Sequence, residues 1–218
     1  MTNPVANRTA PSAEAMGGEG KKSRPQRRSI GARRNPATEE AILDAAEALL
    51  VEKGVKGLTM EAVAKRARAG KATLYKWWPS RGALLVAVYE RAKGTYHHED
   101  KGTLIASIAA FFRFVFTHWQ TPKGQTFALI IAEAQCNADV AEALEHYRLE
   151  RLEALSALVD SAVARGEVKP GVTAKALAET IMAAAWMRLL TGRLDTDPAT
   201  LAQEVLGGWL DGQGVEKG

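Results

Sequence analysis

The residues best suited to bind another molecule lie together in residues 71–81, which read Lys-Ala-Thr-Leu-Tyr-Lys-Trp-Trp-Pro-Ser-Arg. On a helix, side chains four positions apart lie on one face, so Lys71 and Tyr75 lie together while Leu74 and Trp78 form a separate, apolar face. The ammonium, hydroxyl and phenol groups of this stretch donate hydrogen bonds to phosphates and to the edges of bases. A helix with such groups opposite a packed face is typical of one that lies in the DNA major groove.

A second short helix is predicted directly before this stretch, over residues 58–67. Thr59 is expected to cap it with its hydroxyl, and Glu61 in its first turn suits the positive end of the helix dipole. Pro79 then ends the second helix, and Ser80 is expected to cap the one that follows. The pattern predicts two short helices joined by a tight turn.

These two helices and their turn resemble the tetracycline-repressor (TetR) family of bacterial regulators. In that family the second helix typically reads Lys-Gly/Ala-Thr-Leu-Tyr, then an aromatic residue, then Pro-Ser-Lys/Arg. The resemblance covers about a quarter of the chain. It implies that the residues at the start of the second helix reach base edges, and that the later and flanking ones contact phosphates. The expected DNA-binding residues are Thr59, Lys71, Ala72, Thr73, Tyr75, Lys76, Trp77 and Arg81.

Individual roles follow from side-chain chemistry. Lys71 suits a guanine edge, Ala72 a thymine methyl group, and Thr73 either. The alternative for the whole set is an ordinary solvated helix face, and for Trp78 we expect core packing instead of contact with DNA. The sequence departs from the family at Arg68, where the family usually has Gly. A left-handed turn there costs a non-glycine residue roughly 1–2 kcal/mol, so either the turn differs slightly in this chain or the strain is tolerated.

Composition predicts an all-α protein. The chain has 218 residues, of which 46% are apolar and only 6% aromatic, and no alternating apolar and polar run suggests strands. The single Cys136 excludes an intramolecular disulfide and a thiol-rich zinc site, and we expect it to be a small buried side chain in a helix. The N-terminal residues have no apolar run of signal-peptide length, and residues 181–190 are too few to span a bilayer. We therefore expect a soluble cytoplasmic protein without a membrane partner.

Charge is distributed unevenly along the chain. The residues before Thr38 hold eight basic and two acidic side chains, and those from Thr38 to Thr95 hold ten and seven. From Tyr96 onward there are 11 basic and 16 acidic side chains. A basic front and an acidic rear fit a DNA-facing module joined to one that faces something else.

Helical periodicity predicts about nine helices. We expect a disordered basic arm over residues 1–35, because it has almost no large apolar groups. A three-helix DNA-binding head with the helix-turn-helix motif at residues 59–78 is expected over residues 36–96, and a larger helical effector-binding and dimerisation bundle over residues 97–212. The expected helices outside the motif span residues 36–54, 80–95, 104–120, 127–136, 139–164, 173–190 and 197–210.

Other constellations carry weaker signals. The run His97-His98-Glu99-Asp100 has metal-ligand types, but adjacent residues cannot all converge on one ion, so a solvated interdomain loop is preferred over a metal site. Arg148 and Arg151 interleave with glutamates, which indicates a salt-bridged exposed face. No nucleophile elbow, phosphate loop or paired-carboxylate pattern is visible, so we predict no catalytic residues, metal or cofactor.

The resemblance implies a small-molecule effector and a homodimer. An apolar cavity with few polar anchors suits such a ligand, although core packing is the preferred explanation for any one lining residue. The candidate lining residues are Phe111, Phe114, Trp119, Phe127, Met182 and Trp186. The last two helices are expected to pair with their symmetry mates through Ala183, Ala184, Trp186, Met187, Leu201, Val205 and Leu206.

The function that follows is a ligand-responsive repressor that binds a two-fold symmetric operator in double-stranded DNA. Two alternatives stay open. One is an effector-independent DNA-binding or architectural protein, and the other is an all-helical enzyme with a chance match to the motif.

Overall fold

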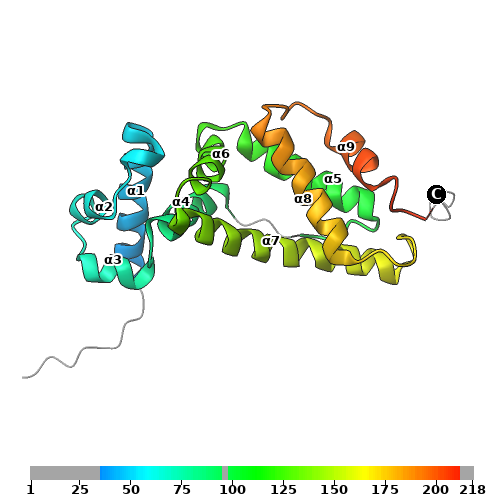
Figure 1. Ribbon diagram of the computed structural model, residues 1–218, viewed down its shortest axis with the longest axis horizontal. Coiled ribbons are helices and arrows are strands. Elements are labelled where there is room, and N and C mark those ends of the chain that lie inside the picture. Colours follow the sequence, from blue (N-terminus) through cyan, green and yellow to red (C-terminus); the bar gives the residue numbers. More distant parts are fainter. Residues whose placement is uncertain (1–34, 95–97, 212–218) are drawn as a thin grey trace, which may run out of the picture. The chain divides into compact units, whose positions relative to one another are not determined.

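The computed structural model describes residues 35–94 and 98–211, and within them it contains nine α-helices (Figure 1). The predicted all-α class is confirmed in these residues, where the only strand-like feature is an isolated bridge between Val168 and Leu210. The predicted basic arm lies outside the described residues, apart from Asn35. The helices are α1 (Pro36–Gly57), α2 (Met60–Arg66), α3 (Lys71–Trp77), α4 (Arg81–Lys93), α5 (Leu104–Trp119), α6 (Pro122–Ala134), α7 (Ala138–Ala164), α8 (Ala174–Leu190) and α9 (Pro198–Leu206).

The first three helices form a small head around buried apolar side chains. Asn35 caps α1 and Thr59 caps α2, each by accepting a hydrogen bond from a backbone N–H of the first turn. Helix α1 departs from helical geometry at Gly54, whose φ of 67° only glycine adopts at little cost. The predicted end of the first helix at this glycine therefore corresponds to a kink, after which one more turn runs to Gly57.

Helix α4 connects this head to the larger bundle (Figure 1). Ser80 caps its start as predicted, and Gly94 ends it with a φ of 74°. Three of its apolar side chains, Leu84, Leu85 and Tyr89, are fully buried and continue the core from the head into the bundle. A shift of α4 would therefore disturb both parts of the core.

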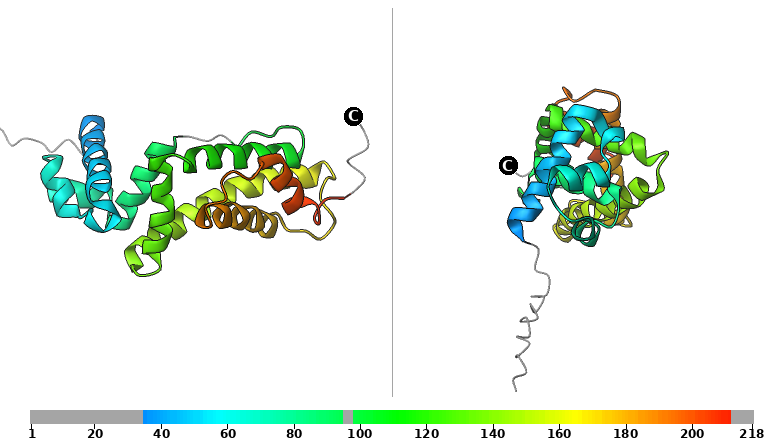
Figure 2. Two further views of the ribbon diagram at one scale, coloured as in Figure 1. Left: turned by 90° about the horizontal axis from the view of Figure 1, so that it is seen from above. Right: turned by 90° about the vertical axis from the view of Figure 1, so that its left-hand side faces the viewer.

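The bundle packs α5, α7, α8 and α9 against one another, with α6 contacting α4, α5 and α7 (Figure 2). Two of its predicted boundaries are wrong. Helix α6 begins at Pro122 instead of Phe127, because Thr121 caps it and proline is well suited to the first turn of a helix. Helix α9 ends at Leu206 instead of Leu210, and the residues after it turn back to pair with the loop at Val168.

Two predictions of burial are also wrong. Cys136 is exposed, because α6 ends at Ala134 and leaves this residue in the turn before α7. Leucine spacing in residues 139–164 predicts that Leu149 points inward with Leu152 and Leu155, but Leu149 is 43% exposed on α7. Among the described residues, no helix is both long and apolar enough to cross a bilayer.

Candidate DNA-binding surface and effector cavity

Helix α3 separates polar from apolar side chains as its sequence predicts. Leu74 is fully buried and Trp78, directly after the helix, is 4% exposed, so this side is anchored to the head. The opposite side carries Lys71, Ala72, Tyr75 and Lys76, all of which are exposed, while Thr73 and Trp77 are partly buried. The structure thus brings the predicted residues of α3 together on one helix with a solvent-facing surface.

The turn between α2 and α3 is held in a left-handed conformation. Arg68 has a φ of 52° and is the one non-glycine with a positive φ in the part of the chain that the structure describes. The Ala69 N–H donates to the Ala64 carbonyl at 3.0 Å, which closes the turn. Of the two alternatives, the structure has the left-handed turn at Arg68, so the strain is tolerated. Across the turn, Lys71 donates to Glu61 at 3.1 Å, and both side chains are well exposed.

The two predicted flanking residues occupy different surroundings. Thr59 is exposed at the start of α2, and its hydroxyl is already used to cap that helix. Arg81 is mostly buried at the start of α4, where its guanidinium donates to the Val55 carbonyl at 3.0 Å and to the Glu133 carboxylate. Arg81 therefore links the head to α6 of the bundle. The resemblance implied instead that Arg81 contacts a phosphate.

The rest of α4 is tied to its neighbours by charge and by close packing. Arg91 donates to Asp44 and Glu47 of α1, both at 2.7 Å. Lys123 of α6 pairs with the same Glu47. The hydrogen bond from Lys123 lowers the pKa of the Glu47 carboxyl most, and the bond from Arg91 lowers it further. At Gly82, a side chain would meet the α7 backbone, since a Cβ there would lie 2.7 Å from the Val140 Cα. Glycine permits this approach between α4 and α7.

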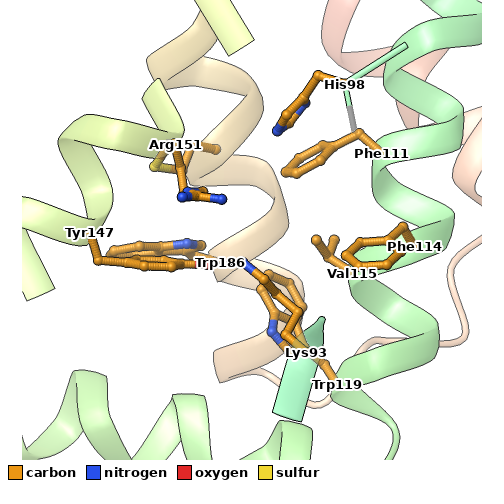
Figure 3. Close-up of a pocket in the computed structure, with 10 residues that line it drawn as sticks. Lys93, His98, Phe111, Phe114, Val115, Trp119, Tyr147, Arg151 and Trp186 are labelled. Atoms are coloured by element: carbon orange, nitrogen blue, oxygen red, sulfur yellow. Dashed lines mark hydrogen bonds between the residues drawn. The ribbon is translucent and has the colours of Figure 1, made fainter. Parts of the chain in front are cut away.

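A cavity lies among α4, α5, α7 and α8 (Figure 3). Five of the six predicted effector residues line it: Phe111, Phe114, Trp119, Met182 and Trp186. The sixth, Phe127, is fully buried and does not line the cavity. It packs behind the wall instead, stacked on Trp119 at 5.9 Å and edge-on to Trp186 at 5.6 Å.

The remaining lining residues are mostly polar, and none of them was predicted from the sequence to line the cavity. They are Lys93, His98, Val115, Tyr147 and Arg151. Lys93 donates to the Tyr147 hydroxyl at 2.9 Å, and Arg151 lies over the Tyr147 ring at 5.4 Å. Arg151 was predicted on a solvated face, and it does contact Glu150 and Glu90 at 3.5 Å, yet it also reaches the cavity.

Burial alters how these groups titrate. It lowers the pKa of Lys93 to about 8, with the nearby Arg151 charge acting in the same direction. Burial, then Arg151 and Lys93, lower the pKa of His98 to about 4, so this imidazole is neutral near pH 7. Burial likewise raises the pKa of Tyr147. The cavity therefore contains neutral aromatic groups and two cations near pH 7.

For two of these polar lining residues, both on α7, the sequence did carry an indication that they lie together. Tyr147 and Arg151 are four residues apart, and their spacing places them on one side of the helix. Nothing local indicates that this side faces α5 and α8. Lys93 carries no such signal, because its position depends on where α4 ends. For the run at residues 97–100, the described residues contain no cluster of three metal-ligand side chains, and His97 lies outside them.

The predicted dimerisation residues divide into three groups. Leu201 and Leu206 are buried inside the subunit and Trp186 lines the cavity, so these three are not on a free face. Met187 is 54% exposed and Ala183 is also exposed, and Leu190 adds a further exposed apolar side chain at 53%. These three define the α8 apolar stripe. Ala184 and Val205 are partly buried against the core.

Comparison with known proteins gives consistent matches. Residues 42–88 match the family model described as bacterial regulatory proteins, tetR family, and residues 98–205 match the tetracyclin repressor-like C-terminal domain. The uncharacterized HTH-type transcriptional regulator YdeS of Bacillus subtilis is 27% identical over 163 residues, which are 73% of this chain and 82% of that protein.

Solved structures share the fold. The TetR family transcription regulator SCO0332 is 32% identical with a TM-score of 0.62, over 78% of this chain and 95% of that one. FadR from Bacillus subtilis, solved in complex with stearoyl-CoA, is 19% identical with a TM-score of 0.53, over 78% of this chain and 96% of that one. The likeness to FadR concerns the fold. With the helix-turn-helix head, the helical bundle and these matches together, the chain belongs to the TetR family of helix-turn-helix transcriptional regulators.

Proposed function

We propose that this protein is a ligand-responsive repressor that binds a two-fold symmetric operator as a homodimer in the bacterial cytoplasm. The observation that carries the proposal is the position of α4, which begins at the Arg81 link to the head and ends with Lys93 in the cavity. Its 13 residues extend about 20 Å. An occupant of the cavity that moves Lys93 acts on the helix that supports the DNA-binding head.

DNA contact is assigned to the exposed side of α3. Lys71 and Ala72 at its start reach base edges, and Tyr75 and Lys76 reach phosphates. Lys71 exchanges its exposed pairing with Glu61 for DNA, and this exchange is inexpensive because surface ion pairs contribute at most about 1 kcal/mol. No catalytic role is proposed for any residue.

Dimerisation is assigned to the α8 apolar stripe, Ala183, Met187 and Leu190. A symmetric pairing removes these exposed side chains from water and holds two heads at a defined separation. Two recognition helices must lie about 34–36 Å apart to enter successive major grooves on one face of DNA. A coupling free energy of roughly 1–3 kcal/mol between cavity and head suffices to change operator affinity 5–150-fold.

The DNA-binding assignment is tested by selecting bound sequences from random duplexes with the full-length protein. Lys71→Ala and Tyr75→Ala should each weaken binding to the selected site, by about 1–3 kcal/mol for a residue that reads a base. Lys175→Ala is the matched control, because Lys175 is an exposed lysine in the first turn of α8. Unchanged affinity in both α3 variants would show that another surface binds DNA.

The dimer assignment is tested by sedimentation equilibrium. Met187→Glu should yield monomers and lose operator binding together, because it places a charge in the apolar stripe. Leu149→Glu, at a similarly exposed leucine on α7, is the control and should stay dimeric. A monomeric wild type, or a Met187→Glu variant that remains dimeric, would refute the interface.

A further inference from the structure

The cavity has a charged side and an aromatic side. Two cations, Lys93 and Arg151, are among its lining residues, and none of the described lining residues carries a carboxylate. The nearest acidic partner of Arg151 is Glu90 of α4, at 3.5 Å, together with Glu150 at the same distance, and neither lines the cavity. The buried Nε of Arg151 has no hydrogen-bond acceptor. The two cations lie close enough for the Arg151 charge to lower the pKa of Lys93, and the Arg151 Nε–H is left to donate to an occupant.

The geometry of the charged side suits an anion. Lys93 and Arg151 approach the Tyr147 ring from positions 4.9 Å and 5.4 Å from its centre, so both cations lie near one aromatic side chain. An ammonium and a guanidinium are donors without any acceptor capacity. A carboxylate is the complement of that pair, because it accepts several hydrogen bonds and neutralises charge where burial makes charge expensive.

The aromatic side suits a flat apolar body. Tyr147 and Arg151 project from α7 on one side of the cavity, and Phe111, Phe114 and Val115 project from α5 on the other (Figure 3). Rings favour offset-stacked or edge-to-face contact with other rings, which an aliphatic chain cannot reproduce. An aromatic occupant therefore gains more from this wall than an aliphatic occupant of similar area.

We propose, on the basis of the function proposed above, that the effector is an aromatic carboxylate whose anionic group lies between Lys93 and Arg151. Its ring system lies against the α5 and α8 aromatic side chains. The cationic pair sets the preference for an anion, and the aromatic wall sets the preference for a ring.

The size of the cavity connects this ligand to regulation. It holds about 30 Å³, room for little more than a water molecule. An aromatic acid must therefore displace lining side chains, and Lys93 is the last residue of α4. Drawing the Lys93 ammonium toward a carboxylate competes with its bond to the Tyr147 hydroxyl and moves the end of the helix that supports the head.

The test compares three probes that share one ring system: 2-naphthoate, the neutral 2-naphthamide and the cationic 2-naphthylmethylammonium. Binding to the full-length protein is measured by isothermal titration calorimetry. We expect 2-naphthoate to bind at least tenfold more tightly than either of the others. Octanoate, an aliphatic carboxylate, should bind more weakly than 2-naphthoate.

Substitutions test which side chains cause the preference for the carboxylate. Arg151→Gln and Lys93→Met should each reduce the preference for 2-naphthoate over the amide at least fivefold, whereas Arg151→Lys, which keeps the charge, should retain most of it. Arg148→Gln is the matched control, because Arg148 lies one turn earlier on α7 and pairs with Glu145. Circular dichroism shows whether each variant is folded. If Arg151→Gln does not fold, comparing the anion preference of Arg151→Lys with that of Lys93→Met still tests the proposal.

The proposal is overturned if the amide or the amine binds as tightly as 2-naphthoate, if none of the probes binds, or if the Arg151 and Lys93 variants keep the full preference. The function proposed above is tested separately, by duplex selection with ligand-free protein. A selected operator together with no anion preference defeats the ligand class alone. Preferential binding of 2-naphthoate without any selected duplex supports the ligand class and defeats the repressor assignment.

Discussion

Replacing Arg81 with methionine distinguishes a structural link from a phosphate contact. In the structure, the Arg81 guanidinium donates to the Val55 carbonyl at 3.0 Å and to the Glu133 carboxylate, so one side chain joins the end of α1 to α6. The side chains of Arg81 and Glu133 are 18% and 17% exposed. Methionine keeps much of the side-chain length and its apolar stem but removes every donor.

The expected loss of stability is worked from these contacts. A hydrogen bond to a charged group contributes about 1.5–3 kcal/mol, and removing one partner of a fully buried ion pair costs about 3–5 kcal/mol. Because Arg81 and Glu133 retain some access to water, we expect Arg81→Met to lower the free energy of unfolding by about 2–4 kcal/mol. Glu133→Gln should cost less, about 1–2 kcal/mol, because it leaves an amide that still accepts a hydrogen bond.

The assay is urea unfolding at fixed protein concentration, followed by circular dichroism, because a dimer's stability depends on concentration. The double variant Arg81→Met/Glu133→Gln completes a cycle, and we expect a coupling of about 1–2 kcal/mol for groups in direct contact. Arg148→Met removes the more exposed pair with Glu145 and should change stability by no more than about 1 kcal/mol.

The same variants give a second readout on DNA. If Arg81 of each subunit neutralises a phosphate, its loss should reduce the slope of log affinity against log salt by about 0.9 per subunit, or about 1.8 for the dimer. As a link between head and bundle, Arg81 should leave that slope unchanged. An Arg81→Met protein with wild-type stability and a reduced salt slope would refute the structural reasoning and restore the phosphate clamp implied by the family resemblance.

Three further outcomes are expected. Arg68→Gly should raise the free energy of unfolding by about 0.5–1 kcal/mol, because relief of the left-handed strain outweighs the added chain entropy, and a lower urea midpoint would contradict this. Gly82→Ala should lower it by about 1–3 kcal/mol, because the new methyl group meets the α7 backbone at Asp139, whereas Gly208→Ala has open space and should stay within about 0.5 kcal/mol. Below pH 6.5 the unfolded chain takes up a proton at His98 while the folded protein does so only near pH 4, so the wild type should lose stability as pH falls through this window. His98→Gln should lose less, and parallel stability curves for the two proteins would contradict that assignment.

Local chemistry predicted the head well. The separation of Lys71 and Tyr75 from Leu74 follows from the helical period, and the cap at Thr59 follows from its hydroxyl. The same local signals misled at Pro122, because the Thr-Pro-Lys-Gly run at residues 121–124 reads as a break between the expected helices 104–120 and 127–136. Proline is unsuited to a helix interior but well suited to a first turn, so the Thr121 cap converts the apparent break into a beginning.

The cavity shows where local prediction ends. Aromatic side chains on α5, α6 and α8 were candidates because a ligand wall and a core have the same composition, and the structure placed Phe127 of α6 in the core and Trp186 of α8 in the wall. The charged side of the cavity could not be predicted from local sequence. Arg151 has the spacing of a solvated residue beside glutamates, and only the packing of α7 against α4 and α5 turns it inward.

Sequence patterns predicted the features that form within one or two helical turns: the nine helices of the described residues, the caps at Thr59 and Ser80, and the polar side of α3. Those features depend on hydrogen bonds and side-chain spacings between near neighbours. Tertiary packing was needed to show that Arg81 bonds to Glu133, 52 positions away, and that Lys93 bonds to Tyr147, 54 positions away. Such pairs form because α4, α6 and α7 bury a common apolar core, and that packing determines which charged side chains at its edge come within reach of one another.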